Sequence, residues 1–163
     1  MDIGFSLPAT RTGSRGAADP RLVCVSEQRV TWTGSDFAFE GFDQLGRMVH
    51  IDTDPEGMGA KPADLLPISL AACTAWDVVN ILRKQRQGLQ GLDVRIETDQ
   101  EEDPPWAFTR ILMHFTITGD VDERKAERAV DLSEQKYCAV AASLRSSVEI
   151  GVTVQVVPAD HES

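Results

Sequence analysis

The residues most able to do chemistry in this chain are three cysteines, Cys24, Cys73 and Cys138. No two of them share the Cys-x-x-Cys spacing of zinc ribbons and thioredoxin-like motifs. An odd number of cysteines in a chain with an intracellular composition argues against a structural disulfide framework. Each is therefore either a small buried hydrophobe or a reactive thiol. Cys24 lies on a predicted strand with no motif around it, and we interpret it as a packing residue.

Cys73 is surrounded by small residues, in the order Ala71-Ala72-Cys73-Thr74-Ala75. Small neighbours leave room either for a ligand at the sulfur or for another helix, so a structural cysteine and a reactive one both fit. A reactive thiol needs a lowered pKa, which a helix amino end or a nearby cation supplies. Cys138 follows 65 residues later, 138 − 73, and is open to the same two interpretations. The spacing alone does not bring the two sulfurs together.

The segment that carries Cys73 predicts a long helix. It starts near Pro62 and Asp64, is apolar on all sides from Leu65 to Leu82, and stops at Gly88, which indicates a buried helix. Pro67 interrupts the pattern because it has no N–H and its ring crowds the preceding turn. Either the helix bends there, or a separate first turn precedes the main helix.

The remaining elements predict an α+β fold. Three short strands form a meander before the helix, and alternating strands follow at residues 92–96 and 108–118. Polar helical segments cover residues 122–136 and then the stretch around Cys138, with Ser133 as a candidate cap, and a strand closes the chain at residues 148–156. No βαβ alternation is present, so the sheet is expected to be mainly antiparallel.

Length and charge narrow the function. The chain has 163 residues and a formal net charge of −10, which disfavours nucleic acid and anionic membrane surfaces as partners. No apolar run of about 20 residues predicts a membrane span, and the first 20 residues are a poor secretory signal, so we expect a cytoplasmic protein. We expect a flexible tail at 1–20, one domain at 21–158 and a short tail at 159–163. His50, His114 and His161 lack metal-ligand spacing, and no cofactor or metal is expected.

Two segments together resemble the cysteine motifs of the OsmC/Ohr family, the osmotically inducible and organic hydroperoxide resistance proteins. They are GAKPADLLPISLAACTAWDVVNILRKQRQ at residues 59–87 and AVDLSEQKYCAV at residues 129–140. The match is nearest to a less characterised branch with a Cys-Ser/Thr-Ala-x-Asp-Val-Val motif. The resemblance covers residues 30–157 and includes the order of strands and helices.

The resemblance implies an OsmC-like α+β fold, with a mainly antiparallel sheet wrapped around a long buried central helix in an intertwined homodimer. Cys73 matches the peroxidatic cysteine and Cys138 the resolving one, in an enzyme that reduces organic hydroperoxides. The partners would be the hydroperoxide and a thiol or dithiol reductant, in some members a lipoylated protein. Trp76, three residues after Cys73, is either a core residue or part of an apolar substrate pocket.

Two departures from the family pattern leave other functions open. The family glutamate corresponds to Ala63, and Asp64, one position later, is either its replacement or a simple first-turn charge. The family arginine has no counterpart near residues 33–36, although Arg29, Arg47 or Arg110 could approach from elsewhere. The alternatives are a non-catalytic dimer that binds a small apolar ligand, and a thiol redox sensor.

Overall fold

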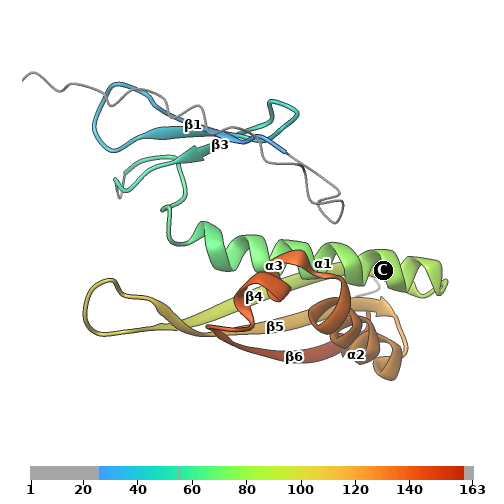
Figure 1. The fold of residues 1–163 in the computed structure, drawn as a ribbon. Coiled ribbons are helices and arrows are strands. Elements are labelled where there is room, and N and C mark those ends of the chain that lie inside the picture. The colour runs from blue at the N-terminus through green and yellow to red at the C-terminus, as the bar shows by residue number, and fades with distance from the viewer. Residues whose placement is uncertain (1–25, 55, 160–163) are drawn as a thin grey trace, which may run out of the picture.

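The computed structural model describes residues 26–54 and 56–159. The N-terminal tail predicted at 1–20, Cys24 and His161 lie outside the described residues. The fold is α+β, as predicted, with two three-stranded sheets and one long helix (Figure 1). Most of the buried core residues lie in one strand, Phe108–Asp120, and in the helices Leu65–Lys84 and Glu123–Leu132.

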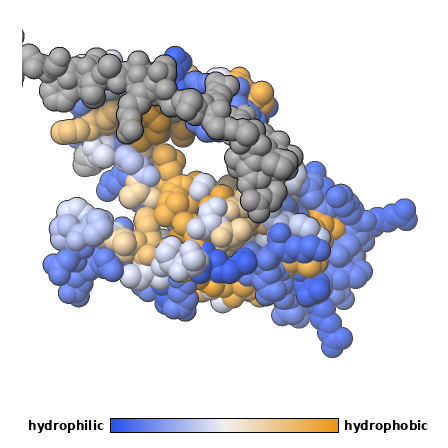
Figure 2. Space-filling model, in the orientation of Figure 1, coloured by the Kyte–Doolittle hydropathy of each residue, from blue (hydrophilic) through white to orange (hydrophobic). Residues whose placement is uncertain are grey.

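The first sheet is the predicted meander of short antiparallel strands. It contains β1 (Arg29–Trp32), β2 (Phe39–Phe42) and β3 (Met48–Ile51). It leaves large apolar side chains uncovered, such as Val30 and Trp32, which are 64% and 57% exposed. In Figure 2 hydrophobic residues gather on the side of this sheet that faces the rest of the molecule. A sheet this small cannot bury its own apolar faces.

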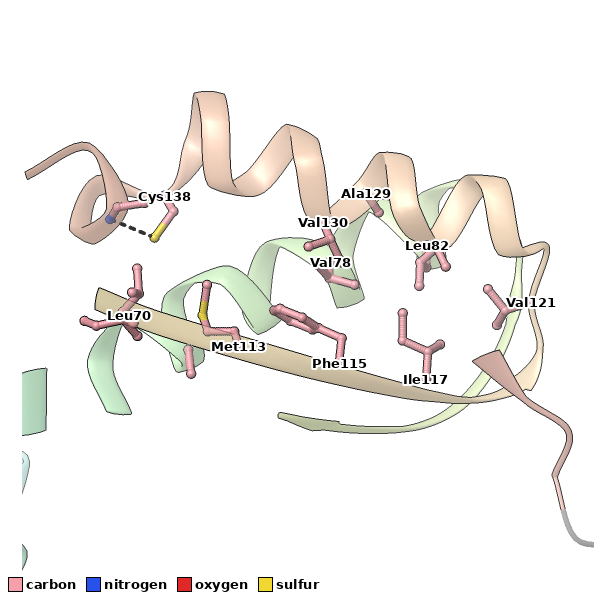
Figure 3. Close-up of a cluster of buried hydrophobic side chains, with 14 of the residues drawn as sticks. Leu70, Val78, Leu82, Met113, Phe115, Ile117, Val121, Ala129, Val130 and Cys138 are labelled. Carbon is pink, nitrogen blue, oxygen red and sulfur yellow. Dashed lines mark hydrogen bonds between the residues drawn. The ribbon is translucent and has the colours of Figure 1, made fainter. Parts of the chain in front are cut away.

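The second sheet forms the floor of the core. β4 (Gly88–Gln100) and β5 (Phe108–Asp120) pair antiparallel over most of their length, and β6 (Glu149–Val157) pairs parallel to β5. The sheet is thus antiparallel at one interface and parallel at the other, because the two helices between β5 and β6 return the chain to the end of the sheet at which β5 began. Alternate residues of β5 point into the core, namely Ile111, Met113, Phe115 and Ile117 (Figure 3).

The long helix α1 (Leu65–Lys84) packs across this sheet and against the second helix, α2 (Glu123–Leu132). Pro67 is its third residue, in the first turn, where backbone N–H groups have no helical acceptor. A hydrogen-bonded turn, in which Asp64 N and Leu65 N donate to Lys61 O, precedes it. The helix thus begins two residues before Pro67 and continues through the proline.

One side of α1 is buried and the other is open within a single chain. Leu70, Val78 and Leu82 are inaccessible, whereas Ile68 and Trp76 are 47% and 70% exposed. The prediction that no run of the chain is long and apolar enough to cross a membrane is wrong for α1, which meets that criterion by length and composition. The core helix of a globular protein meets the same criterion. Its packing on the sheet is that of a core helix with one apolar face left uncovered.

The segment after α2 differs from the sequence prediction. Ser133 was expected to cap a helix that ran through Cys138, but it begins the π-helical turn η1 (Ser133–Tyr137) instead. The following helix α3 (Ala139–Leu144) is capped by Cys138, whose sulfur accepts the Ala141 N–H at 3.4 Å. The serine is unavailable as a cap because its hydroxyl is bonded elsewhere, as described below.

Candidate functional site

Helix α1 supplies the first thiol. Cys73 lies in the middle of the helix and is half-buried between residues that pack into the core, such as Leu70 and Thr74. The Thr74 hydroxyl donates to the Leu70 carbonyl oxygen at 3.0 Å, so its hydrogen is not available to the Cys73 sulfur. The small residues around Cys73 let the η1–α3 segment approach the helix closely.

The η1–α3 segment supplies the second thiol. Cys138 is 1% exposed and belongs to the main core, and Figure 3 shows its sulfur beside α3, on the side that faces Leu70 and Met113. Its backbone N–H donates to Ser133 O at 2.8 Å, a five-residue step that defines the π turn. π turns of this kind are frequent at functional sites.

The structure brings the two thiols together. The Cys73 and Cys138 side chains are neighbours that influence each other, and both cysteines are free thiols rather than a disulfide. Their residues are 65 positions apart in sequence, so only the packing of α3 and η1 on α1 creates this contact. Two adjacent thiols, one partly open and one buried, are a candidate pair for disulfide formation.

The pKa of the Cys73 thiol is raised above its ordinary value. Burial is the main cause, because it disfavours the thiolate, and the neighbouring Cys138 thiol acts in the same direction. The backbone N–H groups of Val140 and Ala139 oppose this shift and lower the pKa. The first N–H groups of α3 therefore serve both sulfurs, since Ala141 donates to Cys138 and its two predecessors face Cys73.

No cation among the described residues contributes to the ionisation of Cys73. Of the arginines considered from the sequence, Arg29 stacks on Phe42 at 4.8 Å in the first sheet, and Arg110 bonds Asp99 and Glu149. Arg47 lies beside Asp43, whose pKa it lowers. Lys136 sits over the Tyr137 ring at 5.4 Å. No three His, Cys, Asp or Glu side chains in residues 26–54 and 56–159 are grouped to hold a metal ion.

Asp64 lies far from Cys73 within one chain. It is the exposed N-cap residue of α1, its side chain makes no cap hydrogen bond, and nine residues separate it from the cysteine. At about 1.5 Å per residue this is about 14 Å along the helix axis. Its predicted catalytic role stays a prediction and requires that a second copy of the chain bring Asp64 to the thiol pair.

Trp76 lines a cleft of about 700 Å³ along the second half of α1. The cleft is also bounded by Ile81, Leu132 and Tyr137, with Lys84 among its polar lining residues. Neither cysteine lines it, although Trp76 follows Cys73 by about one helical turn and Tyr137 directly precedes Cys138. With 70% of its surface exposed, Trp76 is not a core residue of the single chain, and its role in binding a substrate stays a prediction.

Sequence reasoning missed three residues that hold the site in place. Ser133 donates from its buried hydroxyl to the Asp77 carboxylate at 2.8 Å. Arg145 binds the carbonyls of Glu134 and Gln135 and the Glu134 carboxylate, and so ties the end of α3 back to η1. The position of Asp77 four residues after Cys73, within the Cys-Thr-Ala-x-Asp motif, was the available signal.

A family model, a related sequence and a solved structure all match this chain. Residues 53–153 match the family model described as OsmC-like protein. The chain is 34% identical to Protein YhfA of Escherichia coli K12 over 134 residues, which cover 82% of this chain and 99% of that protein. A crystal structure of a hypothetical protein from Aquifex aeolicus is 26% identical with a TM-score of 0.74, covering 83% and 98% of the two chains.

A more distant solved structure shares the fold. It is an organic hydroperoxide resistance protein OsmC from Legionella pneumophila, 18% identical with a TM-score of 0.61, covering 82% of this chain and 98% of that one. At this identity the similarity establishes the fold alone. The resemblance to the OsmC/Ohr family that the two cysteine motifs predicted is thereby confirmed.

Proposed function

Since the chain belongs to the OsmC-like protein family, whose members include organic hydroperoxide resistance proteins, we propose that it is a thiol-dependent peroxidase. The adjacent pair of free thiols, Cys73 and Cys138, is the observation that carries the proposal. A half-buried thiol next to a fully buried one suits the peroxidatic and resolving roles, because peroxide must reach only the first.

The proposed reaction has two steps at the sulfurs. The Cys73 thiolate attacks the O–O bond of the hydroperoxide, the sulfur becomes a sulfenic acid, and the other oxygen leaves as an alcohol after taking up a proton. The Cys138 thiol then condenses with the sulfenic acid, which forms the disulfide and releases water. An external thiol or dithiol reduces the disulfide and restores both thiols, as in a cytoplasmic redox environment.

The position of Cys138 supports the second step. Its sulfur is already in contact with Cys73, so capture of the sulfenic acid competes well with further oxidation to sulfinic acid. Burial at 1% exposure also keeps Cys138 from reacting first with peroxide in solution. The organic class of substrate is inferred from the names of family members.

The test is hydroperoxide consumption with dithiothreitol as reductant, followed by non-reducing peptide mass spectrometry. The wild type should turn over cumene hydroperoxide and accumulate a Cys73–Cys138 crosslink once reductant is exhausted. Cys73→Ser should abolish consumption. Cys138→Ser should stop after a single turnover when no external thiol is present, with Cys73 recovered as sulfenic or sulfinic acid. Consumption at background level, with both wild-type thiols untouched, would overturn the proposal.

The raised pKa of Cys73 and the nearby cleft favour a second candidate, a non-catalytic protein that binds a small apolar molecule. This candidate predicts that hydroperoxide consumption stays at background and that Cys73→Ser leaves ligand binding unchanged. This candidate would be supported if an environment-sensitive apolar dye binds the wild type and the Cys73→Ser variant but not the Trp76→Ala variant. A redox sensor would instead show stoichiometric disulfide formation without multiple turnover.

A further inference from the structure

A second contact joins the two segments that carry the thiols. The Ser133 hydroxyl, at the start of η1, donates to Asp77 Oδ2 at 2.8 Å, and the two residues are 56 positions apart. Ser133 is completely buried. A buried hydroxyl needs a partner, and this carboxylate is the partner that the fold supplies.

The contact is placed to control the distance between the sulfurs. Asp77 follows Cys73 by four residues, so the two lie on the same face of α1. On the other segment, the Ser133 carbonyl accepts the N–H of Cys138 at 2.8 Å, across the π turn. Together with Cys73 and Asp77, Ser133 and Cys138 form a closed ring of contacts. The contact between the two sulfurs lies on one side of the ring, and the hydrogen bond between the Asp77 carboxylate and the Ser133 hydroxyl lies on the other.

The segment from Ser133 to Cys138 is held rigid by hydrogen bonds, so the bond between Asp77 and Ser133 can affect the position of the Cys138 sulfur. Within η1 the Ser133 carbonyl is bonded to Cys138 N, and the carbonyls of Glu134 and Gln135 are bonded to the Arg145 guanidinium. The Cys138 sulfur itself is held by the Ala141 N–H. A shift of Ser133 away from α1 is therefore transmitted to Cys138 rather than absorbed by the turn.

We propose that Asp77 and Ser133 are positioning residues that hold Cys138 against Cys73 and so favour the disulfide between them. This inference rests on the proposed function for its biological meaning, because the disulfide is the product of the resolving step. The bond between Asp77 and Ser133 raises the effective concentration of one thiol at the other.

The expected size of the effect follows from the free energy that one buried hydrogen bond contributes. Its loss should lower the equilibrium constant for disulfide formation by about tenfold. For a two-electron couple, a tenfold change corresponds to about 30 mV in reduction potential. An effect of this size is readily measured in a glutathione redox buffer.

The experiment measures the disulfide fraction of the full chain in mixtures of reduced and oxidised glutathione, by acid quench, alkylation and mass spectrometry. In the exchange the two protein thiols are oxidised to the disulfide, one oxidised glutathione is reduced to two thiols, and the two thiol hydrogens pass to glutathione. No hydroperoxide is used. Thermal melts confirm that each variant is folded at the temperature of the measurement.

Five variants distinguish a positioning role from other roles. Ser133→Ala and Asp77→Ala both remove the bond, and each should lower the equilibrium constant about tenfold, with the double variant no lower than either single one. Asp77→Asn keeps an oxygen acceptor for Ser133 without the charge, and should stay within about twofold of the wild type. Ser147→Ala removes a hydroxyl bonded only to the Leu144 carbonyl at 3.2 Å and should also stay at the wild-type value.

The results test the positioning role of Asp77 and Ser133 separately from the peroxidase activity. Unchanged equilibrium constants in Ser133→Ala and Asp77→Ala would overturn it, and so would an equal loss in Asp77→Asn, which would indicate charge rather than geometry. If the wild type consumes no hydroperoxide but the variants shift as expected in glutathione buffer, the peroxidase proposal fails and the positioning role stands.

Discussion

At the scale of single residues, the balance between burial and backbone N–H groups decides how reactive Cys73 is. Burial and the neighbouring thiol of Cys138 raise its pKa, and the amides of Val140 and Ala139 recover only part of that shift. The ordinary value is 9.0, so at neutral pH the thiolate is a small fraction of the total. In the described part of one chain, the two thiols are therefore adjacent, and Cys73 is mostly protonated at neutral pH.

The first prediction concerns the pH dependence of Cys73. Because its pKa is raised, the thiolate fraction is still increasing at pH 8, and the rate of alkylation by iodoacetamide should rise about tenfold per pH unit from pH 6 to pH 8.5. The measurement is peptide-resolved mass spectrometry of timed samples, with Cys73→Ser as the blank. A rate that levels off near pH 6 would contradict it and would point to a cation supplied by another chain.

At the scale of elements, α1 is the scaffold of both the core and the site. Its buried side packs on β4, β5 and α2, and the same helix carries Cys73 and Asp77. The π turn after α2 changes the direction of the chain, so that Cys138 caps α3 while Ser133 contacts α1. Stability and site geometry therefore depend on the same helix.

A prediction at this scale concerns the buried side of α1. Leu82 is fully inaccessible and belongs to the core that α1 shares with α2 (Figure 3). Leu82→Ala should lower the free energy of unfolding by about 2–5 kcal/mol, because it removes apolar contacts and leaves a cavity. Urea unfolding at a fixed protein concentration measures this.

The control for Leu82 is an exposed leucine. Leu45 is 67% exposed in the turn between β2 and β3, and Leu45→Ala should change the free energy of unfolding by no more than about 0.5 kcal/mol. Equal losses in the two variants would mean that α1 is not packed as described.

At the scale of the whole molecule, the single chain leaves too much apolar surface uncovered. Only 33% of the apolar stretch of α1 is buried, and the first sheet exposes Val30, Trp32 and Met48. Exposed apolar surface of this extent marks an interaction site. We propose that a second copy of the chain covers it, in the homodimer that the family resemblance implied, which would also give Asp64 access to a thiol pair.

A prediction at this scale concerns Ile68, which is 47% exposed on the open side of α1. The wild type should sediment as a dimer. Ile68→Asp should raise the dimer Kd by about a hundredfold, because an unpaired charge buried at an interface costs several kcal/mol. Analytical ultracentrifugation over a dilution series measures the change.

Trp106 provides the control for Ile68. It is 56% exposed in the connection between β4 and β5, and Trp106→Asp should leave the dimer Kd unchanged. A wild-type chain that sediments as a monomer at every concentration would contradict the dimer.

Several features of the chain were determined by its sequence alone. Alternation of apolar residues predicted the strands, and the dense apolar run predicted α1, because these patterns reflect which faces each element must bury. The two cysteine motifs identified the family. The helical spacing of Cys73 and Asp77 also follows from sequence, since residues four apart on a helix share a face.

The contact between the two sulfurs was decided only by tertiary structure. No local pattern relates residues 65 positions apart, and the contact exists because η1 and α3 pack on α1. The π turn and the loss of Ser133 as a cap were equally invisible, because they depend on the Asp77 carboxylate reached across the core. Local sequence determines which groups are present, whereas long-range packing determines which of them touch.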